Sequence, residues 1–92
     1  MGGDSIHDSA VTKYLVEAYA SRVSDTADLE DRAREAAVGL AAAGTEIRHL
    51  TSIRVPEDEI CFHLFEADSI DSVRLASERA EIVPQRIVEA AP

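Results

Sequence analysis

Four stretches of the chain carry the residue patterns that favour β-strands. They are residues 13–20, 45–55, 60–67 and 85–90, and polar or turn-forming residues bound each of them. The third stretch, ICFHLFEA, is the most apolar of the four. Proline followed by two acids at positions 56–58 favours a turn, so the sequence predicts that the second and third strands form a hairpin.

Apolar residues recur at helical spacing in the two segments that separate these strands. The first helix is carried by Leu29, Ala33, Ala36, Ala37 and Leu40, and the second by Ile70, Val73, Ala76 and Ala80. Asp25 or Thr26 can cap the start of the first helix, and Gly44 can supply the left-handed residue that ends it. Asp68 or Ser69 can cap the second helix in the same way.

The predicted elements follow the order β-α-β-β-α-β. This order is that of the ferredoxin-like, or split βαβ, arrangement. We therefore expect an α+β fold with a four-stranded antiparallel sheet, in the strand order 4-1-3-2, and both helices on one face of it. Residues 13–92 are predicted to form this single domain, and residues 1–12 a flexible N-terminal lead-in.

The third strand is apolar at nearly every position, which bears on what covers the open face of the sheet. One alternating set is Ile60, Phe62 and Leu64, and the other is Cys61, His63 and Phe65. A strand with water on one side would show polar residues at alternate positions. Burial of both sets calls for a partner, so the sequence predicts a homodimer in which two sheets pair as a dimeric α+β barrel.

Composition and charge narrow the range of partners. Of the 92 residues, 18 are acidic and 9 are basic, which gives a net charge of −9. This charge repels nucleic-acid phosphates and anionic membrane surfaces, so neither is an expected partner. No apolar run approaches the roughly 20 residues of a membrane helix, and the first residues lack the bases and the apolar stretch of a signal peptide. We therefore expect a cytoplasmic protein.

The assignment of side chains to the two faces of the sheet predicts which residues can form a binding site. The small side chains of Val16 and Ala18 suit the helix-covered face of the first strand, so Glu17 and Tyr19 are expected on the open face. The set of third-strand residues that contains His63 is expected to share that open face. The predicted ligand-binding residues are Glu17, Tyr19, His63 and Phe65.

Histidine and cysteine side chains in the hairpin also suggest a metal site. Imidazole and thiolate are ligands that divalent zinc, nickel and copper accept. The predicted metal ligands are His49, Cys61 and His63. His49 joins the other two in only one hairpin register, because a slip of one residue moves it to the other face.

Each of these residues also fits a purely structural role. His63 would then be a buried histidine with one satisfied hydrogen bond, and Cys61 a small hydrophobic side chain. Glu17 would form an ion pair with Arg86 or Arg48. The aromatic residues would belong to the core of the dimer.

Short patterns along the strands carry a resemblance to a protein family. They are KYLVEAY at 13–19, E-x-RHL at 46–50, CF-x-LFEA at 61–67, ERA at 78–80 and RIVE at 86–89. With these patterns the chain resembles a family of short bacterial proteins of unknown function that is described as nickel-binding-protein-like. The resemblance implies a ferredoxin-like fold and a homodimer. At least one member of the family binds nickel, and Cys61 is the residue carried over directly.

Two hypotheses about function follow, and a third is simpler. The first is a homodimeric binding module that is not an enzyme and holds nickel, zinc or a small ligand on or beneath its sheet. The alternative is a cofactor-free isomerase or monooxygenase, with His63 or Glu17 as base and a pocket of about 300 Å3 or more beside His63. The third is a structural dimer whose acidic surface meets a basic partner. The sequence contains no HExxH, CxxC, GxSxG, GxGxxG or P-loop motif.

Overall fold

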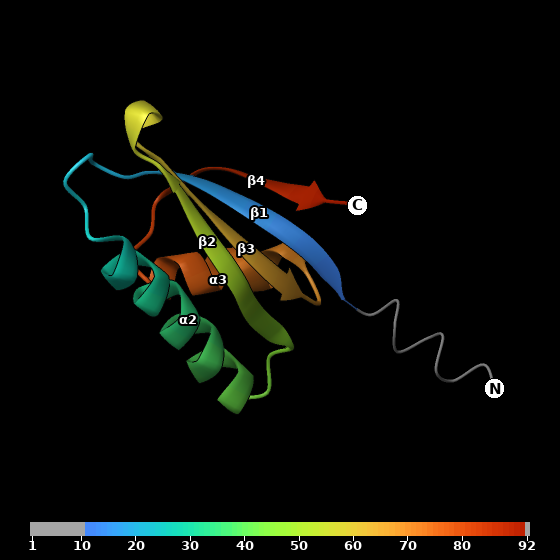
Figure 1. The fold of residues 1–92 in the computed structure, drawn as a ribbon. Coiled ribbons are helices and arrows are strands. Elements are labelled where there is room, and N and C mark those ends of the chain that lie inside the picture. Colours follow the sequence, from blue (N-terminus) through green and yellow to red (C-terminus); the bar gives the residue numbers. More distant parts are fainter. Residues whose placement is uncertain (1–10, 92) are drawn as a thin grey trace.

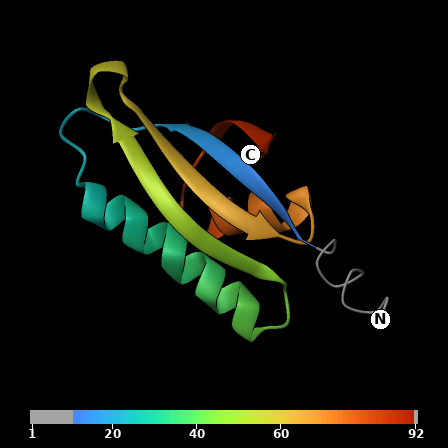
Figure 2. The same ribbon diagram turned by 45° about the vertical axis from the view of Figure 1, so that its right-hand side comes forward.

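In the computed structural model, which describes residues 11–91, two helices cover one face of a four-stranded antiparallel sheet (Figures 1 and 2). The elements are β1 (Thr12–Tyr19), α2 (Thr26–Ala42), β2 (Ile47–Val55), the short 3-10 helix η1 (Pro56–Asp58), β3 (Ile60–Ala67), α3 (Ile70–Arg79) and β4 (Pro84–Ala90). The strand order is β2-β3-β1-β4. The predicted ferredoxin-like fold and strand order are confirmed. Most of the predicted lead-in, residues 1–10, lies outside the described residues.

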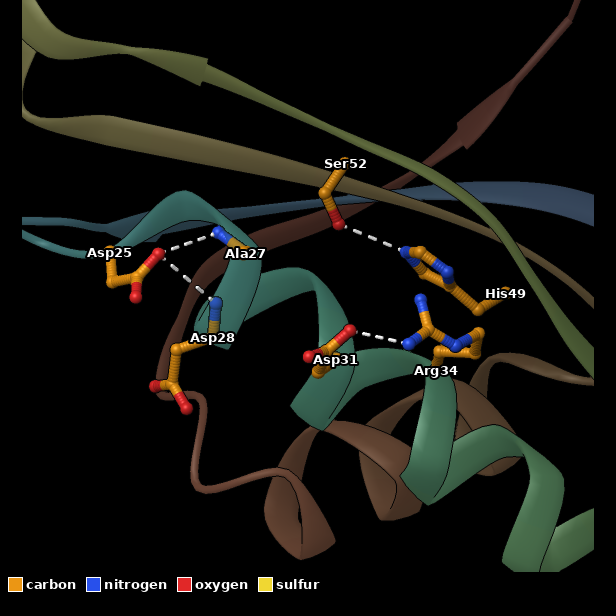
Figure 3. A network of polar contacts seen from close by, with 7 residues as sticks. All are labelled: Asp25, Ala27, Asp28, Asp31, Arg34, His49 and Ser52. Atoms are coloured by element: carbon orange, nitrogen blue, oxygen red, sulfur yellow. Dashed lines mark hydrogen bonds and ion pairs between the residues drawn. The ribbon is translucent and has the colours of Figure 1, made fainter.

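The ends of α2 follow the predicted capping residues. Asp25 accepts hydrogen bonds from the backbone N–H groups of Ala27 and Asp28, at 2.9 and 3.4 Å (Figure 3). These bonds satisfy N–H groups that have no partner within the helix. After the helix, Gly44 adopts a φ of 106°, which L side chains rarely adopt. The capping aspartate and the terminal glycine therefore set the length of α2.

The core lies between the sheet and the two helices. Its members are Val16, Ala18, Ala33, Ala37, Leu40, Ile47, Phe65, Ala67, Val73, Ala76, Ala80 and Ile82. Phe65 of β3 is the largest fully buried side chain. Because the buried face of α2 is mostly alanine, this helix can lie close along β2 (Figure 2). The small side chains of α2 therefore bring this helix close to the sheet.

The pairing of β1 with β3 fixes the face of every β3 side chain. Val16 stands opposite His63, and Ala18 stands opposite Cys61. Residues that stand opposite each other in an antiparallel pair point to the same face of the sheet. Because Val16 and Ala18 belong to the core, His63 and Cys61 lie beneath the helices too.

An irregularity in β2 changes which of its residues lie beneath the helices. The β2–β3 register shifts between His49 and Thr51, as in a β-bulge. On one side of the shift His49 stands opposite Phe65, and on the other side Ser52 stands opposite His63. Without the shift, positions 49 and 52 would point to opposite faces, since side chains alternate along a strand. With it, both face the helices.

The two glycines of the α2 region should respond in opposite directions to alanine. We expect Gly44→Ala to lower the free energy of unfolding by about 1–2 kcal/mol, because the added Cβ disfavours a positive φ. Gly39→Ala, within α2, should raise it by about 0.5–1 kcal/mol, because alanine favours the helix. Neither new Cβ would meet an atom within 4 Å, so both effects come from the backbone. Urea denaturation measures both, and changes of the same sign would contradict this account.

Candidate functional site

The predicted position of the third-strand residues on the open face is wrong. Cys61, His63 and Phe65 are at most 1% exposed, and all three lie on the face that the helices cover. The reason is the register with β1, which pairs them with the core side of that strand. Both alternating sets of β3 are apolar, so the sequence pattern alone could not distinguish the two faces.

The predicted position of Glu17 and Tyr19 on the open face is confirmed. Glu17 stands opposite Phe62, and Tyr19 stands opposite Ile60. Glu17 forms an ion pair with Arg86, with 3.3 Å between Oε1 and Nε. Glu17 therefore does not converge with His63 and Phe65, because it is on the opposite face of the sheet.

Beneath the sheet, two histidines and one serine form a hydrogen-bonded row. Ser52 Oγ lies 2.9 Å from Nε2 of His49 and 2.7 Å from Nδ1 of His63. The His49 ring also packs edge-on against Phe65. Figure 3 shows the bond from Ser52 to His49, with Arg34 of α2 beside the histidine ring. Sequence reasoning missed Ser52, since only the shifted hairpin register brings it opposite His63.

The predicted metal ligands do not form a metal centre. Ser52 lies between the two histidines, whose ring centroids are 6.4 Å apart. No group of three or more His, Cys, Asp or Glu side chains close enough to hold a metal ion occurs within residues 11–91. Cys61 makes only a weak contact, 3.9 Å from its Sγ to the carbonyl oxygen of Phe62. His49 and His63 come together as predicted, but through a serine hydroxyl.

Burial keeps these groups uncharged. It lowers the pKa of His63 to about 4, and the charges of His49 and Arg32 act in the same direction. Burial also lowers the pKa of His49, against the charge of Glu30, which raises it, and together with that of Arg34, which lowers it. It raises the pKa of the Cys61 thiol. At neutral pH the row therefore consists of two neutral imidazoles and a hydroxyl.

The Ser52 hydroxyl joins the two imidazoles through one donated and one accepted hydrogen bond. Its single proton can be donated to only one of the two rings, so the other ring donates to the Ser52 oxygen. Which ring donates depends on the tautomers of the two histidines. Nδ1 is the atom through which His63 joins the row.

A cavity of about 210 Å3 opens beside His63. It is lined by Ala18, Tyr19, Leu29, Arg32, Cys61, His63, Glu81, Ile82 and Val83. His63 is the member of the row that lines this cavity, whereas His49 and Ser52 do not line it. A wider groove of about 850 Å3 lies between α3 and β4, and none of the predicted site residues lines it. The cavity beside His63 is therefore the candidate site.

Arg32 is a second polar residue of this cavity that sequence reasoning did not select. Its Nε lies 3.3 Å from Oδ2 of Asp28, and its Nη1 lies 3.8 Å from Oε1 of Glu81. The Nε atom is buried and has no partner with hydrogen-bond geometry. The i,i+4 spacing on α2 accounts for the Asp28–Arg32 pair. No sequence pattern indicates that the segment after α3 brings a cavity to this arginine.

Comparisons with protein-family models, with curated proteins and with solved structures give no match for this chain. Neither α2 nor α3, the helices of residues 11–91, is long and apolar enough to cross a membrane. The function is therefore argued from the geometry of the chain alone.

The buried histidines should make the fold sensitive to acid. The pKa of His63 falls from 6.5 to about 4 on folding, so the unfolded chain binds the proton more tightly. The stabilisation is complete above pH 6.5 and is lost as the pH falls to about 4, by an amount on the order of 3 kcal/mol. Urea unfolding at several pH values measures this loss. His63→Gln should show a smaller loss, and stability that is flat or rising on acidification would contradict the burial of a neutral His63.

The direction of the row can be measured by nitrogen NMR of the imidazole rings. Of the two nitrogen atoms that face Ser52, Nε2 of His49 and Nδ1 of His63, we expect one to carry a proton and the other to lack it. In Ser52→Ala the link is removed, so both rings should mix their two neutral forms. Protons on both facing nitrogen atoms, or on neither, in the unaltered protein would contradict the hydrogen-bonded row.

Proposed function

We propose that the chain is a homodimeric binding module that pairs through the open face of its sheet and holds a small ligand beside His63. The observation that carries the proposal is a neutral His63 whose Nδ1 is held by Ser52 and which lines a cavity. The proposed ligand lies beneath the sheet, not on its open face.

The residues of the open face support the dimer. Its apolar members are Leu15, Tyr19, Ile53, Val55, Ile60, Phe62, Leu64 and Val88. Tyr19 is 61% exposed and Ile53 is 56% exposed, and no helix of the described chain covers them. Two ion pairs lie on the same face, Glu17 with Arg86 and Arg48 with Glu66. An exposed apolar patch on a sheet face is typical of protein interfaces.

The size of the cavity favours binding over catalysis. The enzyme hypothesis predicts a pocket of about 300 Å3 or more beside His63. The cavity has about 210 Å3, and the second proposed base, Glu17, is on the other face of the sheet in an ion pair. A small cavity with one imidazole suits the retention of a small molecule. The resemblance to nickel-binding-protein-like proteins remains a prediction, for which Cys61 and His63 supply two donors.

Leu64→Glu should break the dimer without unfolding the chain. Leu64 stands opposite Leu15 on the open face, so the new carboxylate would be buried only in the dimer. Sedimentation at micromolar concentration should give twice the chain mass for the unaltered protein and the chain mass for Leu64→Glu. Val38→Glu is the matched control, because Val38 is 62% exposed on α2.

The control is expected to remain dimeric with an unchanged circular dichroism spectrum. A monomeric unaltered protein would refute the dimer, and so would a dimer that survives Leu64→Glu. Dissociation of Val38→Glu would place the interface on α2 instead.

A further inference from the structure

The last strand, β4, forms one edge of the sheet. It pairs with β1 on one side, and no strand of residues 11–91 pairs with its other side (Figure 1). In an antiparallel ladder, successive residues direct their backbone N–H and C=O groups alternately to one side of the strand and to the other. Alternate residues of β4 therefore direct these groups away from β1. Pro84 has no N–H group, so the edge that can donate begins at position 85.

A groove of about 850 Å3 lies along this edge. It is lined by Asp71, Arg74, Leu75, Glu78, Glu81, Ile82, Val83, Pro84, Arg86 and Ile87. Ile87 stands opposite the core residue Val16, whereas Arg86 stands opposite Glu17 on the open face. The groove therefore contacts side chains from both faces of β4, so it reaches the edge of the strand and is not confined beneath the sheet.

Apolar side chains of the groove are exposed beside the free edge. Leu75 of α3 is 39% exposed, and Val83, just before β4, is 83% exposed. Ile82 and Ile87 supply further apolar surface. An extended peptide that pairs with an edge strand gains backbone hydrogen bonds from the strand and places alternate side chains in a neighbouring groove. The free edge and the groove together fit this mode of binding.

The charges of the groove favour a basic partner. Both of its arginines are paired with carboxylates, Arg74 with Asp71 at 3.2 Å and Arg86 with Glu17 at 3.3 Å. Glu78 has no ion-pair partner among the residues that the structure describes. The whole chain carries a net charge of −9, which attracts a cationic segment and repels a second copy of the chain.

We propose that the groove between α3 and β4 binds a basic peptide segment, which adds a strand to the free edge of β4. Apolar side chains of the segment lie against Leu75 and Val83, and a basic side chain pairs with Glu78. This interaction goes beyond the proposed function, since it depends neither on a ligand beside His63 nor on the dimer.

The test is a titration of the full, isotope-labelled chain with three end-blocked peptides, followed by amide NMR. The peptide KVKVKVK should shift the amide signals of β4 saturably. The peptide EVEVEVE should bind at least about tenfold more weakly, because its carboxylates meet an acidic chain. KVKVKVK with every backbone nitrogen methylated keeps its charges but has lost the N–H donors of its backbone. It should also bind at least about tenfold more weakly.

Variants of the chain locate the binding site. Leu75→Ser should weaken binding of KVKVKVK by about tenfold, because it removes an apolar wall. Val38→Ser is the matched control, since Val38 is 62% exposed on α2 and does not line the groove. Glu78→Lys should weaken binding by about fivefold, whereas Glu35→Lys makes the same change of charge outside the groove. Circular dichroism confirms that each variant is folded.

Several results would overturn the proposal. Equal affinity for the methylated peptide would refute strand addition, and equal affinity for EVEVEVE would refute a basic partner. Equal losses in Leu75→Ser and Val38→Ser would refute the groove as the site. Shifts of the β4 signals with chain concentration alone would place a second copy at this edge instead. No shift with any peptide would refute the proposal and leave the function proposed for the His63 cavity intact.

Discussion

Every strand of the sheet has two faces, and the pairing of β1 with β3 decides which β3 side chains lie beneath the helices. With Val16 opposite His63, the histidine lies with the core residues and Phe62 and Leu64 lie on the open face. A slip of one residue would exchange these two sets. The buried row, the cavity beside it and the apolar open face therefore all depend on the same ladder of hydrogen bonds.

The pairing of the strands also lowers the free-energy cost of burying polar side chains beneath the sheet. A buried imidazole or hydroxyl without a partner costs free energy, whereas His49, Ser52 and His63 satisfy one another. The shifted register in β2 makes this possible, because it brings Ser52 to the covered face opposite His63. The row stays uncharged at neutral pH, so it needs no counter-ion. Its member His63 lines the cavity that the core leaves beneath the sheet.

The sequence predicted the elements and their order well, because helical and strand periodicities differ and the caps are chemically distinct. Asp25, Ser69 and Gly44 end or begin helices as expected. The prediction of which β3 side chains lie beneath the helices was wrong. Both alternating sets of this strand are apolar, so the sequence pattern does not show which set is covered. The register shift after His49 was not predictable, since no glycine or proline marks it. Without the shift, Ser52 is an ordinary strand residue, so the row could not be found from the pattern.

Cys61 tests the central assignment of faces most directly, because it is the only cysteine and it shares the face of His63. The measurement is the rate at which an aromatic disulfide reagent, too large for the cavity, labels the thiol in monomeric Leu64→Glu. With Cys61 1% exposed beneath the helices, we expect labelling no faster than transient unfolding allows, even though the open face is free. Rapid labelling of the folded monomer would place Cys61 and His63 on the open face and contradict the account.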